Sequence, residues 1–105
     1  VVNYRGSKKG PQLAIVLHDS EPPMGPPLGV KRISDPKFPQ RFDMDAPVGR
    51  TYYYRVWIDM DGAGSGVDKT TDPMANPKTS PSSTVPSSGA ATPVVLELTD
   101  PPHSW

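Results

Sequence analysis

Four aspartates beside three alternating glycines form the most metal-like pattern in the chain, DMDGAGSGVDKTTD. The aspartates are Asp59, Asp61, Asp68 and Asp72. Calcium takes several oxygen ligands, and aspartates close together on a glycine-rich turn can surround such a cation. The pattern therefore predicts a calcium site.

A hairpin turn is the alternative interpretation of the same segment. An EF-hand loop supplies oxygen ligands at its fifth and twelfth positions, where a count from Asp59 places Ala63 and Thr70. Asp-Gly is also a common dipeptide in the tight turn between two strands. The residues alone leave both interpretations open.

Four aromatic side chains could form a partner-binding platform, because exposed aromatic rings bind sugars, peptides or a neighbouring chain. They are Tyr4, Tyr53, Trp57 and Trp105. Tyr53 and Trp57 share one face of a candidate strand over residues 51–61. The alternative interpretation is that the four rings only cover the open edge of a small sheet structure.

The sequence does not predict an enzyme. The chain has no cysteine, which excludes a disulfide, a thiolate metal site and a cysteine nucleophile. His18 and His103 lack a recognisable nucleophile and orienting group. Eleven basic and eleven acidic residues give zero net charge, with no basic block for nucleic acid. Apart from the possible calcium, no cofactor is expected.

Length and composition predict a single domain over residues 1–105 with a small core. Hydrophobic residues make up 34% of the chain, and 15 prolines and 9 glycines interrupt it. The sequence has no apolar run of the length that spans a membrane.

Strands must carry the fold, because apolar residues alternate and helical spacing is almost absent. The candidate strands are residues 1–6, 12–19, 28–34, 39–45, 51–61 and 93–99. Residues 12–19, QLAIVLHD, are apolar on both faces and are predicted to form a central strand. Residues 39–45 are predicted to place Phe42 and Met44 on the core side.

Residues 69–92 are predicted to be a low-complexity loop. Much of this segment is rich in serine, threonine and proline, and such a composition buries too little apolar surface to offset the entropy of ordering. This loop is also the candidate site for O-glycans. The candidate acceptors are Thr79, Ser80, Ser82, Ser83, Thr84, Ser87, Ser88 and Thr92.

Six or seven short strands with frequent turn signals predict an all-β fold, a small antiparallel β-sandwich of the immunoglobulin-like or transthyretin-like kind. A small barrel is the alternative. The ordered core is small, so a partner, a metal or a neighbouring subunit could add stability.

The order of motifs between residues 12 and 61 resembles the C-terminal periplasmic domain of cytochrome c-type biogenesis proteins. The motifs are QLAIVLHD, then GPPLGVKRI at 25–33, then FPQRFDMD at 38–45, then a strand that runs into IDMDG. The resemblance implies an all-β extracytoplasmic domain, periplasmic or secreted, that binds protein. In that family the role is to hold apocytochrome c during haem attachment.

Three functions are therefore kept as hypotheses. The first is a non-enzymatic domain that binds a polypeptide through a strand edge or the Tyr53 and Trp57 face. The second is a self-assembling extracellular filament or surface subunit, with calcium and O-glycans. The third is a carbohydrate-binding module that uses the same aromatic rings.

Overall fold

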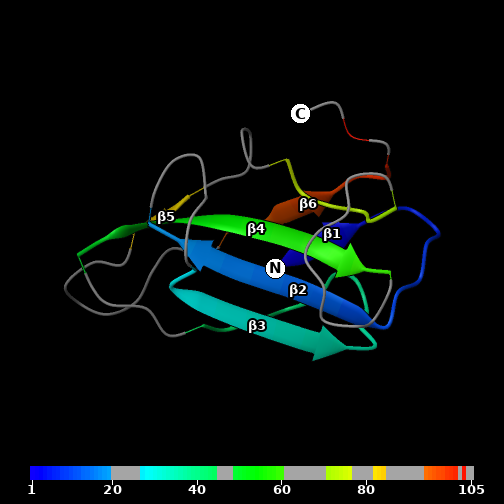
Figure 1. The fold of residues 1–105 in the computed structure, drawn as a ribbon, viewed down its shortest axis with the longest axis horizontal. Helices are drawn as coiled ribbons and strands as arrows, with labels where there is room; N and C mark the ends of the chain where they lie inside the picture. Colours follow the sequence, from blue (N-terminus) through cyan, green and yellow to red (C-terminus); the bar gives the residue numbers. More distant parts are fainter. Residues whose placement is uncertain are drawn as a thin grey trace.

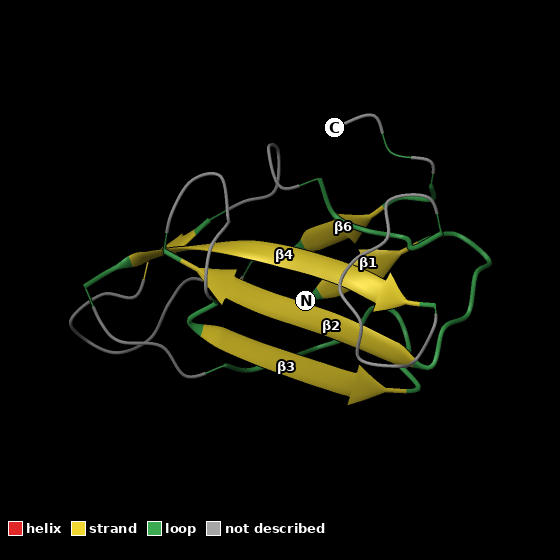
Figure 2. Cartoon of the chain, in the orientation of Figure 1, coloured by secondary structure: helices red, strands yellow, loops and turns green. Residues whose placement is uncertain are grey.

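The computed structural model describes residues 1–19, 27–44, 49–60, 71–76, 82–84, 94–101 and 103. The regular structure in this part consists of strands, which confirms the all-β prediction there (Figures 1 and 2). The strands are β1 (Val2–Tyr4), β2 (Gln12–His18), β3 (Gly29–Ser34), β4 (Thr51–Asp59), β5 (Ser83–Thr84) and β6 (Leu96–Leu98). The described residues include no helix that could cross a membrane.

β2 is an inner strand of a curled antiparallel sheet with the order β3-β2-β4-β5. It pairs with β3 on one side and with β4 on the other (Figure 1). Every residue of β2 after Gln12 is buried. A strand covered on both faces needs apolar residues at successive positions, as in LAIVL. The predicted central place of this strand is confirmed.

The inner face of this sheet carries the main core. The alternating pattern of β4 directs every second side chain inward, as expected for a pleated strand. The buried members of the core are Val2, Tyr4, Leu13, Ile15, Leu17, Tyr52, Tyr54, Val56, Ile58, Ala75, Leu96 and Leu98. A second cluster on the outer face contains Ala14, Val16, Trp57 and Met74.

A second, two-stranded sheet pairs β1 with β6 in parallel. Residues 73–75 join it to β4: Ile58 donates its amide to the Pro73 carbonyl at 2.9 Å, and Ala75 donates to Val56 at 3.0 Å. Met74 exchanges backbone hydrogen bonds with Thr99, directly after β6. Hydrogen bonding therefore continues from the large sheet into the small one.

The predicted strand over residues 39–45 is wrong, because its described part forms no continuous strand, but the prediction of which side chains face the core is right. In the described part, residues 39–44, only Gln40 forms a bridge, and it exchanges two hydrogen bonds of 2.8 Å with Val2. Phe42 and Met44 nevertheless pack against the core, as their alternation predicts. Side-chain alternation thus fixed which residues face inward without fixing strand pairing.

Part of the predicted loop over residues 69–92 is packed against the sheet. Residues 72–75 are buried and bond to β4, and β5 pairs with the start of β4. Composition averaged over the loop conceals the short Pro73-Met74-Ala75 segment, which is apolar enough to be covered. Residues 69–70, 77–81 and 85–92 of that loop lie outside the described part of the chain.

Candidate functional site

The predicted calcium ligands are only partly described, since Asp61 and Asp68 lie outside the described residues. Asp59 is buried and accepts a hydrogen bond from the Arg32 guanidinium at 3.3 Å. The ion pair crosses over β2, because Arg32 and Asp59 lie on strands at its two sides. A basic group therefore faces the Asp59 carboxylate in this structure.

Asp72 is buried and holds the chain that returns to the end of β4. Its carboxylate accepts hydrogen bonds from the Met60 amide at 3.1 Å and from the Thr71 hydroxyl at 3.2 Å. The ring of His103 lies 2.9 Å from the Asp72 carbonyl oxygen. Across the described stretches of the chain, no three carboxylate, histidine or cysteine side chains gather as a metal site would require. Calcium stays a prediction from the sequence.

The Trp57 ring is not exposed, which corrects the expectation of an open aromatic face. Its exposed fraction is 4%, and it packs with Met74 and Ala14 on the outer face of the sheet. The Arg55 guanidinium lies over the ring, 5.7 Å from its centre. Tyr53 is half-buried. Sheet register explains the error, because apolar residues of β2 and the bridging Met74 extend the buried area onto this face.

The other two predicted aromatics do not join Tyr53 and Trp57. Tyr4 is buried in the main core on the inner side of the sheet, so its ring is not exposed either. Trp105 lies outside the described residues. The described structure thus brings together Tyr53 and Trp57 on one strand and separates Tyr4 from them.

Ser83 is buried, unlike the other two predicted O-glycan acceptors that the structure describes, Ser82 and Thr84. Its side-chain oxygen accepts a hydrogen bond from the Tyr54 hydroxyl at 2.7 Å. The Thr84 hydroxyl lies 2.9 Å from that of Thr51. Ser82 is exposed. The other five acceptors, Thr79, Ser80, Ser87, Ser88 and Thr92, lie outside the described residues.

β3 is the end strand of the four-stranded sheet (Figure 1). Its six residues pair continuously with β2, and within the described ranges no strand pairs with its other side. Pro27 and Pro36 flank the strand, but no proline or bulge interrupts it. A regular strand edge of this kind is a template for another extended chain.

The backbone groups that point away from β2 can be assigned from the register. Asp35 donates its amide to the Pro11 carbonyl at 3.0 Å, one residue beyond the last paired positions. In an antiparallel pair, residues bonded to the partner alternate with residues whose amide and carbonyl point away. Ile33 is therefore bonded to β2. The outward residues are Val30, Arg32 and Ser34. The backbone groups of Val30 and Ser34 have no backbone partner in the described ranges outside this sheet.

Two exposed apolar side chains accompany this edge. Leu28, directly before β3, is 47% exposed, and Val30, the second residue of β3, is 53% exposed. The side chain of Val30 lies on the outer face of the sheet, beside Val16 of β2. Single exposed apolar residues are common on protein surfaces. Here the two lie two residues apart, at the same end of the strand edge as the outward backbone groups of Val30.

A cavity that the sequence did not predict lies near the start of β2 and the end of β4. Its lining comes mainly from connections, residues 6–10 and 35–38, which the sequence marks only as turns. The available signal was the lysine-rich turn SKKG between two strands.

Comparison of the chain with protein-family models, with curated proteins and with solved structures finds no match. The resemblance to cytochrome c-type biogenesis proteins therefore depends only on the motifs between residues 12 and 61. Function has to be argued from the edge of β3 and from the cavity.

Proposed function

We propose that this chain is a non-enzymatic binding domain that takes up an extended polypeptide along the open edge of β3. One observation carries the proposal: the amides and carbonyls of Val30 and Ser34 point away from β2 along a regular strand. An added strand would satisfy these groups with backbone hydrogen bonds, the mode called β-augmentation.

The edge suits a partner with apolar residues at alternate positions. Leu28 and Val30 offer exposed apolar area near the edge, so an added strand gains most where its own apolar side chains lie beside them. Backbone bonding tolerates many sequences, which fits an unfolded polypeptide. From the family resemblance, we propose apocytochrome c as that polypeptide, an extracytoplasmic location and a β-sandwich as the finer fold.

A second copy of the chain fits this edge less well. If two β3 edges paired antiparallel with full overlap, Arg32 would lie opposite Arg32 of the second copy, because it is the middle one of the three outward residues. Like charges directly opposite each other destabilise a strand pair. The alternative function, a self-assembling subunit, would therefore have to use another surface or a shifted register.

Proline substitution at the edge tests the proposal. Val30→Pro removes an outward amide without touching a bond to β2, so the sheet should remain intact. The control, Val30→Thr, keeps the amide and changes the side chain. A fluorescent apocytochrome c peptide that includes its haem-attachment segment is the probe, and binding is followed by anisotropy.

We expect Val30→Pro to weaken binding at least about tenfold, because it removes a backbone hydrogen bond to the peptide and the proline ring keeps the peptide from approaching the edge closely. Val30→Thr should bind within about threefold of the original chain. Equal affinity of all three proteins would contradict the proposal. Ser34→Pro provides a second edge variant, in case Val30→Pro does not fold.

A further inference from the structure

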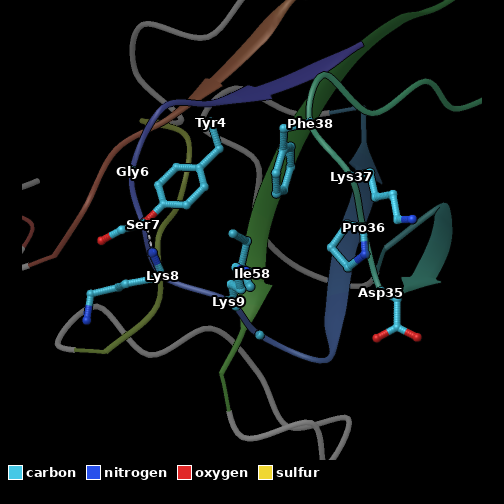
Figure 3. Close-up of a pocket in the computed structure, with 11 residues that line it drawn as sticks. Tyr4, Gly6, Ser7, Lys8, Lys9, Asp35, Pro36, Lys37, Phe38 and Ile58 are labelled. Carbon is cyan, nitrogen blue, oxygen red and sulfur yellow. Dashed lines mark hydrogen bonds between the residues drawn. The ribbon is translucent and has the colours of Figure 1, made fainter.

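The cavity near the start of β2 has a volume of about 380 Å³. Figure 3 shows the rings of Tyr4 and Phe38 next to each other along the cavity, with Ile58 of β4 lower in the view. The two rings meet edge to face, with centres 5.6 Å apart. Small-molecule sites usually begin at about 300 Å³ and are mostly apolar. The space fits one ring or one short apolar chain.

The walls are fixed by close packing. A methyl group added at Gly6 would lie 2.3 Å from the Tyr4 hydroxyl oxygen, and one added at Gly10 would lie 2.5 Å from Ile58 Cγ2. Both glycines therefore allow the connection before β2 to approach the cavity floor. The Tyr4 hydroxyl also accepts a hydrogen bond from the Lys8 amide at 3.1 Å. The Tyr4 ring and the connection before β2 are therefore held in place where they line the cavity.

The rim of the cavity is mainly basic. Lys8, Lys9 and Lys37 line it together with a single acidic residue, Asp35. Neither of the two ion pairs found among the described residues involves these lysines. Lys8 and Lys37 stand on opposite sides, with their ammonium groups extended outward (Figure 3). A lysine has a flexible four-carbon stem, so each can swing toward a bound anion.

We infer that this cavity binds a carboxylate attached to a small apolar group. The apolar group lies against Tyr4, Phe38 and Ile58, and the carboxylate lies among the rim lysines. Two sources share this chemistry: a free small carboxylate, and the C-terminal residue of a peptide. The inference does not use the edge of β3, so either proposal can fail without the other.

Matched acids and amides test this inference by NMR titration of the isotope-labelled chain. The free-ligand arm uses 3-phenylpropionate and 3-phenylpropanamide. The peptide arm uses a pentapeptide that ends in phenylalanine, as the free acid and as the C-terminal amide. The readout is the shift of the Gly6, Gly10 and Phe38 amide signals, whose residues line the cavity.

We expect the acid of at least one arm to bind more tightly than its amide, and the arm that binds identifies the source. Inorganic phosphate, which lacks an apolar group, should bind more weakly. The inference is overturned if acid and amide bind alike in both arms, if phosphate matches the acids, or if no cavity signal moves at millimolar ligand.

Charge variants of the rim provide the second readout. Lys8→Gln and Lys37→Gln should each lower the affinity for the acid by about two- to fivefold, the range for exposed ion pairs. Asp35→Asn should raise the affinity for the acid by a similar factor. Asparagine tolerates the positive φ of 50° at this position as aspartate does, so the turn is kept.

Arg50→Gln is the matched control for net charge. Arg50 is exposed and precedes β4, whereas Ile58 of the cavity floor lies eight residues further along, about 25 Å away in an extended strand. This variant should leave the affinity for the acid unchanged. If Arg50→Gln lowers the affinity for the acid as much as Lys8→Gln does, binding follows net charge and the cavity assignment is wrong.

Discussion

The hydroxyl of Tyr4 lies 2.5 Å from a carboxylate oxygen of Asp100 and donates a hydrogen bond to it. Tyr4 ends β1, and Asp100 follows β6 by two residues, so the bond joins the carboxyl-terminal ends of the two strands of the small parallel sheet. The ring of Tyr4 also forms one wall of the cavity. Stability of the small sheet and shape of the cavity therefore depend on the same side chain.

This bond predicts a loss of stability at alkaline pH. Burial raises the pKa of the Tyr4 phenol above its usual value of about 10, and the bond to Asp100 acts in the same direction. The unfolded chain therefore releases this proton at lower pH than the folded chain. The stabilisation is complete below pH 10 and is lost as the pH rises through the folded pKa.

Urea unfolding at pH 8, 10 and 11 checks this prediction. Tyr4→Phe should lower the free energy of unfolding at pH 8 by about 1 kcal/mol. It should also flatten the fall in stability above pH 10. Tyr53→Phe is the control and should leave that fall unchanged. A profile of Tyr4→Phe parallel to that of the original chain would contradict the assignment.

The ion pair of Arg32 with Asp59 predicts energetic coupling across β2. Asp59 is 1% exposed in its side chain and Arg32 is 30% exposed, so the pair is only partly screened by water. In a double-mutant cycle of Arg32→Met and Asp59→Asn, we expect a coupling free energy of about 1–2 kcal/mol. Additive losses in chemical unfolding would show that the pair contributes little.

Met74 is predicted to be important for stability although it lies within the low-complexity region. It is buried against Trp57 and exchanges hydrogen bonds with Thr99, so it joins the two sheets. Met74→Ala should destabilise the chain by about 2–4 kcal/mol. The exposed Val95 provides a control, and Val95→Ala should cost less than about 0.5 kcal/mol. Similar losses for both would contradict this packing role.

The calcium prediction has a direct test. Calcium held by Asp59, Asp61, Asp68 and Asp72 would raise the thermal unfolding temperature, and a chelator would reverse the rise. Replacing both Asp61 and Asp68 by asparagine should abolish the effect. Asp43→Asn, a change at an exposed aspartate, should preserve it. An unfolding temperature indifferent to millimolar calcium would contradict the prediction.

Strand faces could be predicted from the sequence because the pleat has a period of two. The inward residues of β4 and β6, and even Phe42 and Met44 outside any strand, follow that alternation. The parallel pairing of β1 with β6 could not be predicted, since it joins residues more than ninety positions apart. Local pattern does not encode which distant strand becomes a neighbour.

The candidate sites were harder to predict for the same reason. Exposure of Trp57 depends on Met74 and β2, which lie far away in the sequence. The cavity is formed where the connections over residues 6–10 and 35–38 meet, and neither connection alone indicates a site. The open edge of β3 is also a property of sheet order. Composition and motifs therefore led only to the hypothesis of binding, whereas the positions of the proposed surfaces depend on topology.

Hydrogen exchange along β3 tests the polypeptide-binding proposal most directly. The amides of the original chain are followed with and without the apocytochrome c peptide. We predict that binding slows exchange at Val30 and Ser34 by at least about tenfold, because these outward amides gain partners. The amide of Ile33, already bonded to β2, should change little. Bound peptide without protection of the Val30 and Ser34 amides would contradict the proposal.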